Sequence, residues 1–195
     1  MRKAHGMKTI EKIWKSVLSL GKSKTSMYMN DISTSLNKWD LRYLNLAANV
    51  ATWSKDPSTK IGAIAIGKKG QVLAQGYNGF PRGIEDTPTR YAIKKQKYKL
   101  VVHAEMNVIY NATYNGISLD GSTLYVNGLP VCSDCAKGII QVGVKKVVMK
   151  DTEIPKQWIE SWEETKGMFN EAGIEWYFIN TNTGKARGLY EEEIS

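Results

Sequence analysis

Cysteine and histidine are scarce in this chain, which has two of each among 195 residues. A secreted fold held together by disulfides uses more cysteine, so this class is excluded. The sequence also lacks a run of about 18 apolar residues, which argues against a membrane-spanning helix. Residues 1–26 contain no apolar core of a signal peptide. We therefore expect a cytoplasmic protein without a membrane partner.

The chain carries a formal net charge of +8, and its lysines are spread along its whole length. Such a charge suits an anionic partner, either the phosphates of a nucleotide or a nucleic acid. It suits a solvated lysine-rich surface equally well. Apolar residues make up 42% of the chain and charged residues 24%, the balance of an ordinary globular protein. The length predicts one domain with a sizeable core.

The first 35 residues read as an extension, and residues 36–195 read as the main domain. Apolar residues recur at helical spacing between residues 10 and 18, which predicts an amphipathic helix. Gly21 is placed to end that helix. The polar, Ser- and Thr-rich stretch 23–35 is typical of a linker.

The main domain alternates predicted helices and strands, which indicates an α/β fold with helices on both faces of a sheet. A long segment with proline and glycine, 79–99, is too long for a plain connection and is a candidate functional loop. The predicted helices cover residues 39–54, 104–114, 133–142 and 155–170, and the predicted strands cover 61–66, 72–77, 123–127, 145–149 and 174–179.

Three of the four scarce residues fall into one pattern, His103-Ala104-Glu105 followed by Cys132-Ser133-Asp134-Cys135, and the fourth, His5, lies in the predicted extension. Catalytic zinc commonly has three protein ligands and leaves a position for water, and His103, Cys132 and Cys135 supply three. Each ligand falls at the start of a predicted helix, where the dipole favours thiolates. Glu105 is then free to move protons between a zinc-activated water and a substrate.

This pattern matches the H-x-E and P-C-x-x-C signature of zinc deaminases, with one departure. Val131 separates Pro130 from Cys132, which leaves the metal set intact but makes the turn before Cys132 uncertain. A redox-active C-x-x-C pair and two structural cysteines are the alternatives. Neither accounts for the His103-Ala104-Glu105 motif.

Several segments resemble the deoxycytidylate (dCMP) deaminases, and the likeness covers roughly residues 39–150. The most discriminating is Gly76-Tyr77-Asn78-Gly79-Phe80-Pro81-Arg82-Gly83. The others are Asp56–Ala63, His103–Asn107, Leu124–Val126, Cys132–Lys137 and Gln141–Lys145.

The resemblance implies a three-layer α/β/α cytidine-deaminase-like fold around a mixed five-stranded sheet. It implies Zn²⁺ as cofactor and hydrolysis of dCMP to dUMP and ammonia, which supplies dUMP for thymidylate synthesis. It also implies a homo-oligomer, with a hexamer favoured, and nucleotide effectors: dCTP as activator and dTTP as inhibitor.

The resemblance also implies site residues. Tyr77, Asn78 and Gly79 would bind the effector, and Asn78 could instead or also hold the deoxyribose. The implied substrate contacts are Lys55, Ser58, Lys60, Asn78, Ala104, Asn107 and Tyr125, of which Lys55, Ser58 and Lys60 would lie near the phosphate. Structural roles stay open for several: a turn at Gly79, a local hydrogen bond at Asn107 and a core position at Tyr125. The lysines could be plain surface residues.

Three other functions compete with dCMP deamination. A deaminase of bases in tRNA or single-stranded DNA fits the charge and the aromatic residues, but the segment 76–83 argues against it. A dCTP or dual dCMP/dCTP deaminase would suit the lysine-rich stretch 94–97, which we interpret as a solvated helix face. A zinc-stabilised assembly module without catalysis would have no use for Glu105.

Overall fold

The computed structural model describes residues 38–188, which form one mixed six-stranded sheet with helices on both faces. The strands are β1 Gly62–Ile66, β2 Val72–Tyr77, β3 Thr123–Asn127, β4 Lys146–Lys150, β5 Glu175–Ile179 and β6 Ala186–Gly188. The helices are α2 Lys38–Ala51, α3 Pro88–Ala92, α4 Lys94–Leu100, α5 Ala104–Tyr114, α6 Ser133–Gln141, the short 3₁₀ helix η1 Lys156–Trp158, and α7 Ile159–Ala172.

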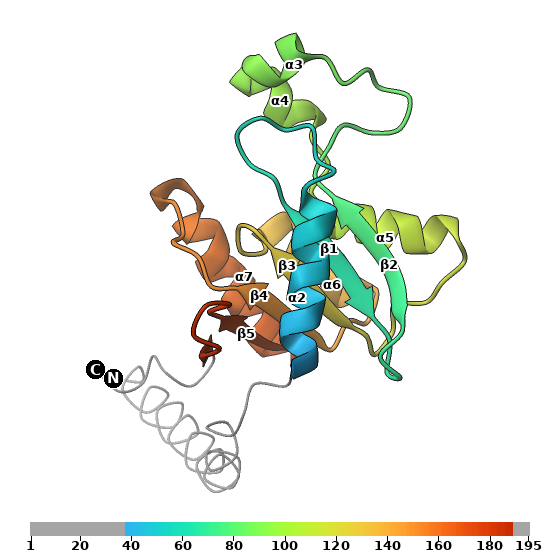
Figure 1. Cartoon of the computed structure of the whole chain (residues 1–195), viewed down its shortest axis with the longest axis vertical. Helices are drawn as coiled ribbons and strands as arrows, with labels where there is room; N and C mark the ends of the chain where they lie inside the picture. The colour runs from blue at the N-terminus through green and yellow to red at the C-terminus, as the bar shows by residue number, and fades with distance from the viewer. Residues whose placement is uncertain (1–37, 189–195) are drawn as a thin grey trace, which may run out of the picture. The chain divides into compact units, whose positions relative to one another are not determined.

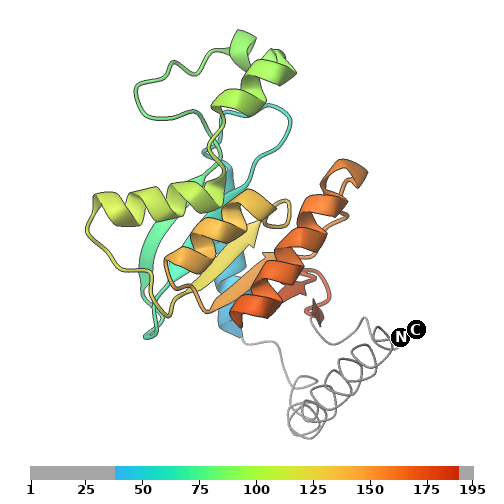
Figure 2. The ribbon, with the colours of Figure 1, turned by 180° about the vertical axis from the view of Figure 1, so that it is seen from behind.

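The sheet order is β2-β1-β3-β4-β5-β6. Strand β1 pairs antiparallel with β2 and β3, whereas β3, β4 and β5 run parallel. Helix α6 connects β3 to β4, so its first turn lies beyond the carboxyl end of β3 (Figure 2). The carboxyl edge of parallel strands is where open α/β sheets usually place their ligands.

The predicted three-layer architecture is confirmed. Helix α2 covers one face of the sheet (Figure 1), and α5, α6 and α7 cover the other (Figure 2). The predicted number of five strands is wrong by one. Strand β6 pairs antiparallel with β5, and two of its three residues are exposed. Such a short strand has no apolar alternation from which to predict it.

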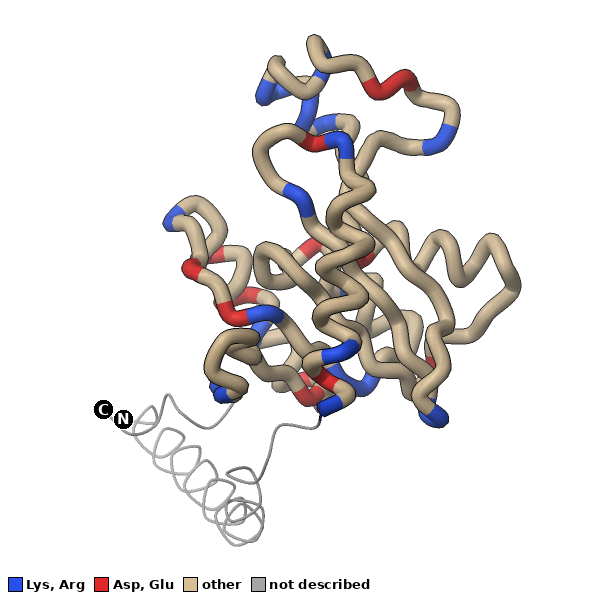
Figure 3. The backbone as a smooth tube through the Cα atoms, in the orientation of Figure 1, with Lys and Arg blue, Asp and Glu red and all other residues tan. Residues whose placement is uncertain are grey.

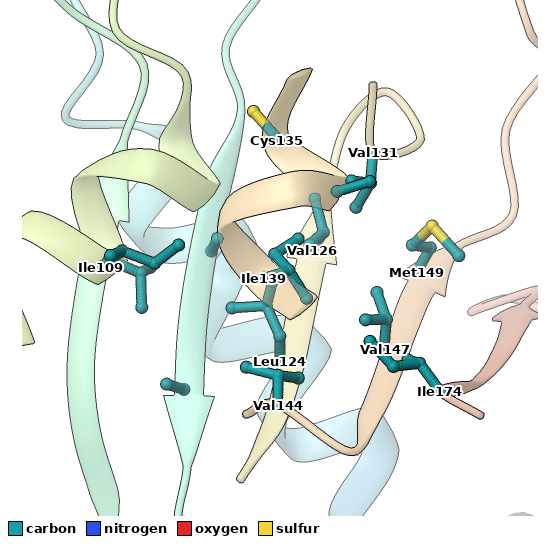
Figure 4. Packing of buried hydrophobic residues seen from close by; sticks show 14 of the residues in the cluster. Ile109, Leu124, Val126, Val131, Cys135, Ile139, Val144, Val147, Met149 and Ile174 are labelled. Atoms are coloured by element: carbon teal, nitrogen blue, oxygen red, sulfur yellow. The ribbon is translucent and has the colours of Figure 1, made fainter. Parts of the chain in front are cut away.

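The core has two parts, one on each side of the sheet. Figure 4 shows Leu124, Val126 and Val147 of the sheet packed against Ile139 of α6, and all four are at most 2% exposed. A second cluster lies under α2 and includes Tyr125. Successive residues of β3 therefore point to opposite layers, as the two-residue period of a strand requires.

The long segment 79–99 contains α3 and α4, which lie apart from the sheet at one end of the molecule (Figure 1). The predicted helix 155–170 divides into η1 and α7, because Pro155 precedes a single 3₁₀ turn. The predicted extension 1–35 lies outside the described residues. Within residues 38–188, no helix is both long and apolar enough to cross a membrane.

Candidate metal centre and cavity

His103, Cys132 and Cys135 lie together although 32 residues separate the first from the last. The Nδ1 atom of His103 is 3.3 Å from Sγ of Cys132 and 3.4 Å from Sγ of Cys135. All three ligand atoms lie within 4.8 Å of one another. Among residues 38–188, no other group of His, Cys, Asp and Glu side chains is clustered in this way.

Two helix N-termini hold the ligands. His103 is the N-cap of α5 and Cys132 is the N-cap of α6, while Cys135 lies in the first turn of α6. The partial positive charge of a helix N-terminus stabilises thiolates. Cys135 is also part of the core, at 1% exposed (Figure 4). The two cysteine ligands therefore lie at the start of a helix that is anchored in the core.

Gly76 of β2 explains how α5 comes close to the sheet. A Cβ at Gly76 would lie 2.5 Å from the carbonyl oxygen of Ala104 and 2.5 Å from the backbone nitrogen of Val108. Helix α5 therefore packs against β2 at a distance that only glycine permits. Because His103 and Glu105 belong to the same end of α5, this contact sets their position.

Val131, the departure from the deaminase signature, is packed in the core. It is 0% exposed, and its carbonyl oxygen accepts a 3.0 Å hydrogen bond from Oγ1 of Thr165 in α7. Beside it, the backbone N–H of Ser133 donates to Oγ of Ser161 at 2.9 Å. Hydrogen bonds to α7 therefore anchor the chain on both sides of Cys132.

The electrostatics of the three ligands suit a cation. Hydrogen bonding from Cys135, opposed by burial and assisted by His103, lowers the pKa of the Cys132 thiol to about 4. Hydrogen bonding to Cys132 raises the pKa of His103 to about 9 in spite of burial. Hydrogen bonding to Cys132, together with burial, raises the pKa of the Cys135 thiol. One imidazole with two thiolates is a ligand set that zinc accepts, and zinc would replace the protons on these groups.

Glu105 is a buried carboxylate beside these ligands. It is 3% exposed, and among the described residues its Oε2 atom has no hydrogen-bond partner. Burial raises the pKa of Glu105 to about 7. A carboxyl group with a pKa near neutrality can both take up and release a proton, which is what a general acid–base requires. An unpartnered oxygen also fits a site made to bind water or substrate.

One cavity is lined by Glu105 and by two of the three metal ligands, His103 and Cys132, and it extends away from them. The segments that line it are the loop 56–61, helix α4, the turn 129–132, and the region of η1 and the start of α7. The lining residues are Asp56, Ser58, Thr59, Ile61, Asn78, Lys97, Tyr98, Val101, His103, Glu105, Leu129, Pro130, Val131, Cys132, Pro155, Gln157, Trp158, Ser161 and Trp162.

A buried ion pair forms part of the cavity wall. Nζ of Lys97 lies 2.6 Å from Oδ2 of Asp56 and donates to Oγ of Ser58 at 2.6 Å. The Asp56 side chain is 1% exposed and that of Lys97 is 12% exposed. Burial acts to raise the pKa of Asp56, but hydrogen bonds from Lys97, Ser58 and Thr59 hold it below its ordinary value.

Two of the substrate contacts expected from the resemblance, Ser58 and Asn78, line the cavity. The Asn78 amide is fully engaged within the neighbouring loop. Its Oδ1 accepts from the N–H of Ile61 at 2.8 Å, and its Nδ2 donates to the carbonyl oxygen of Thr59 at 2.8 Å. Asn78 therefore shapes the loop that forms one wall of the cavity.

The remaining expected substrate contacts do not line the cavity. Lys55 is exposed and paired with Asp86 at 3.1 Å. Nδ2 of Asn107 donates to the carbonyl oxygen of Tyr77 at 2.7 Å. The side chain of Tyr125 faces α2 on the other side of the sheet. Lys60 is exposed and Ala104 is fully buried.

Two of the residues with expected effector roles also lie outside the cavity lining. Tyr77 is 38% exposed, and its ring meets that of Trp53 edge to face at 6.1 Å. Gly79 forms an isolated bridge with Val102. Tyr77 is thus exposed at the end of β2, whereas Gly79, two residues beyond it, is buried.

Lys97 and Trp158 are among the lining residues that sequence reasoning missed. The interpretation of residues 94–97 as a solvated helix face is wrong for Lys97, because Asp56 draws its ammonium group inward. Trp158 meets Tyr98 edge to face at 6.3 Å, so α4 and η1 contact each other beside the cavity. No local sequence signal marks either residue, since each depends on a partner distant in the chain.

Comparison with known proteins gives one family over most of the domain. Residues 37–151 match the sequence model of the cytidine and deoxycytidylate deaminase zinc-binding region. An uncharacterised deaminase of Aliivibrio fischeri is 35% identical over 142 residues, which cover 72% of this chain and 92% of the relative. The deoxycytidylate deaminase of Homo sapiens is 34% identical over 144 residues, with coverage of 70% and 77%.

A solved structure shares the fold. The dCMP deaminase of the cyanophage S-TIM5, in its apo form, is 28% identical with a TM-score of 0.57, and the match covers 73% of this chain and 98% of the phage chain. A second structure of that phage enzyme, 25% identical in the match, is a complex with dCMP and dUMP.

Proposed function

This chain belongs to the cytidine and deoxycytidylate deaminase family, and on that premise we propose that it hydrolyses dCMP to dUMP and ammonia. The observation that carries the proposal is the Oε2 atom of Glu105, which has no hydrogen-bond partner within residues 38–188 and is buried in the same cavity as His103 and Cys132. A structural zinc site has no use for such a carboxylate. A deaminase needs one, because its reaction moves protons from water to the base.

His103, Cys132 and Cys135 would hold the zinc. When bound there, zinc supplies a Lewis acid that makes a water molecule acidic enough to act as a nucleophile near neutral pH. Two thiolates and one imidazole would supply three ligands, the number that catalytic zinc sites commonly have.

Glu105 moves the protons of the reaction. Its carboxylate takes one proton from the attacking water and delivers it to N3 of the cytosine ring. The water oxygen bonds to C4, and the remaining proton on that oxygen passes to the amino group as the C4 carbonyl forms. The C4–N4 bond then breaks, and the products are dUMP and ammonia. A pKa near neutrality suits a group that must alternate between the two protonation states.

The backbone at the start of α5 supports the same step. Ala104 is the first residue of α5, and amides in the first turn of a helix have no acceptor within that helix. We expect a backbone N–H group near Ala104 or Cys132 to stabilise negative charge that develops on the substrate in the transition state. For Ala104, the expected role would then be one of its backbone.

A substrate panel tests the proposal. We expect the zinc-loaded protein to release ammonia from dCMP faster than from dCTP, cytidine or a cytosine-containing oligonucleotide. Preference for the oligonucleotide would indicate a nucleic-acid deaminase, and preference for dCTP would indicate a triphosphate enzyme. Inertness toward all four substrates would contradict the proposal.

Regulation and assembly belong to the same proposal. The exposed pair of Tyr77 and Trp53 lies outside the cavity lining, which suits an effector site separate from the active site. We expect a homo-oligomer in the cytoplasm, with a hexamer favoured, that dCTP activates and dTTP inhibits. Sedimentation and initial rates with each effector measure both properties, and a monomer whose rate neither nucleotide changes would contradict them.

A further inference from the structure

We propose that Lys97 determines the specificity of the cavity by binding the 5′-phosphate of the nucleotide, with Asp56 as the residue that positions it. This inference rests on the proposed function and deepens it. Among the described residues that line the cavity, Lys97 is the only Lys or Arg. The ammonium group of Lys97 is therefore the cationic group of this lining that can pair with a nucleotide phosphate.

The position of Lys97 is unusual for a lysine. Lysines are rarely buried unless they are paired, yet this side chain is 12% exposed on a short helix otherwise rich in exposed lysines. Its Nζ atom contacts both oxygens of Asp56, at 2.8 Å and 2.6 Å, and Oγ of Ser58. The ammonium group is thus held in place before a ligand arrives, which lowers the entropy lost on binding.

Asp56 does not need Lys97 for its hydrogen bonds. Its Oδ1 accepts from the N–H and Oγ of Ser58, both at 2.9 Å, and from the N–H of Thr59 at 3.2 Å. Asn78 donates to Oδ2 at 3.4 Å. The loop 56–59 is therefore closed by its own hydrogen bonds. A buried ion pair adds little to stability on its own, so a role for Lys97 in binding accounts better for its place in the cavity wall.

Nearby lysines do not replace Lys97. Figure 3 shows basic positions on the loop before β1 and along α3 and α4, at the same end of the molecule. Lys55 of that loop is 67% exposed and paired with Asp86, and neither Lys55 nor Lys60 lines the cavity. Lys94 of α4 lies over the ring of Tyr98 at 5.8 Å, again outside the lining.

The charge of the pair favours a nucleoside monophosphate. The Asp56 carboxylate lies directly behind the Lys97 ammonium, and the low pKa of Asp56 keeps it ionised. A triphosphate would bring more negative charge toward Asp56 without meeting a further lysine or arginine in the wall. A nucleoside without phosphate would leave the ammonium unused. We therefore assign the cavity to pyrimidine nucleoside 5′-monophosphates.

The test compares Lys97→Met with Lys95→Met, an exposed lysine of the same helix that is absent from the lining. Methionine keeps the apolar stem and removes the charge. We expect Lys97→Met to lower kcat/KM for dCMP by about 10- to 100-fold, mainly through KM, the range for loss of a charged hydrogen bond. Turnover of deoxycytidine and zinc content should not change, and Lys95→Met should match the wild type.

Direct binding separates this inference from the proposed function. Calorimetry with dUMP and deoxyuridine needs no turnover, and we expect the preference of the wild type for dUMP to vanish in Lys97→Met. Lys97→Arg keeps the positive charge and should restore part of that preference. An unchanged dUMP preference in Lys97→Met would overturn the inference even if dCMP is the substrate. Equal losses for dCMP and deoxycytidine would also overturn it, by showing a structural role.

Discussion

The two ends of the cavity are built in different ways. At the metal end, the ligands begin two helices that pack into the core, and Cys135 is itself a core residue. At the other end, Asp56 and Lys97 lie 41 residues apart, on a loop and on a short helix away from the sheet. Reaction chemistry therefore depends on the packing of the sheet. The phosphate recognition that we propose depends on one ion pair between two peripheral segments.

The largest effect should follow from removing a ligand at the metal end. We expect Cys132→Ala to lose bound zinc and all measurable activity, because one imidazole and one thiolate are too few ligands to retain the metal. Metal analysis of the purified variant measures the bound zinc, and a rate assay measures the remaining activity. Full zinc retention would remove Cys132 from the ligand set.

The next largest effect should follow from removing the ionisable group of Glu105, at the same end of the cavity. Glu105→Gln keeps the shape of the side chain, and we expect it to keep zinc while turnover falls by roughly 10²–10⁴-fold, the contribution of general acid–base catalysis. Rates and metal content measured on the same preparation separate this loss from the one in Cys132→Ala. Activity close to the wild type would exclude Glu105 as the proton carrier.

Substitutions at two glycines test whether the close packing of α5 on β2 positions the metal site. A Cβ at Gly76 would lie 2.5 Å from backbone atoms of α5, whereas at Gly79 the nearest atom would be 3.7 Å away. We expect Gly76→Ala to lower the free energy of unfolding by about 1–3 kcal/mol and to weaken zinc binding, as overpacking does. Gly79→Ala is the matched control. Equal behaviour in urea unfolding would show that the close approach of α5 is not required.

Unfolding measurements at acidic pH test the ion pair of Asp56 and Lys97 at the other end of the cavity. The folded-state pKa of Asp56 lies below its ordinary value of 3.8, so its stabilising contribution is complete above that pH. The contribution is lost as pH falls through the folded-state pKa. We expect Asp56→Asn to be less stable than the wild type at neutral pH, with the difference narrowing in acid below about pH 4. Urea unfolding at several pH values would reveal a constant difference if Asp56 does not titrate in this way.

The smallest effect is expected at the exposed ion pair. Lys55 is 67% exposed and pairs with Asp86 outside the cavity. We expect Lys55→Ala to change the free energy of unfolding by less than about 1 kcal/mol, as is usual for surface pairs. The KM for dCMP should change by less than about twofold, a small fraction of the affinity that a charged contact provides. A rise in KM comparable to that of Lys97→Met would return the phosphate contact to Lys55.

Most of the metal end could be predicted from the sequence. The ligands are local to two short motifs at predicted helix starts, and the structure brings the three ligands together. The order of the helices that cover the sheet and of its first five strands was also predictable, because apolar periodicity repeats within each element. Helix α3, within the expected loop 79–99, was not predicted. Strand β6 was missed, since an exposed three-residue strand exists only through its pairing with β5.

The side-chain contacts at the other end could not be predicted in the same way. Tyr125 on a buried strand could face either layer, and its hydroxyl group donates to Asp40 of α2, away from the cavity. Asn107 was assigned to the substrate by resemblance, yet it bonds the backbone of β2. In each case the partner comes from another element, and spacing along the chain does not identify it.

The sequence by itself determined the chemistry of this protein: a scarce set of one histidine, two cysteines and one glutamate at signature spacing, which defines a zinc deaminase. Only the tertiary structure decided which lysine faces the cavity. The segment 55–99 contains many lysines, and among them Lys97 alone is drawn inward. Burying its charge is favourable because the Asp56 carboxylate, fixed by hydrogen bonds of its own loop, pairs with it. The metal ligands are found within short motifs. Lys97, the residue that we propose binds the phosphate, depends instead on a contact with Asp56, 41 positions away in the chain.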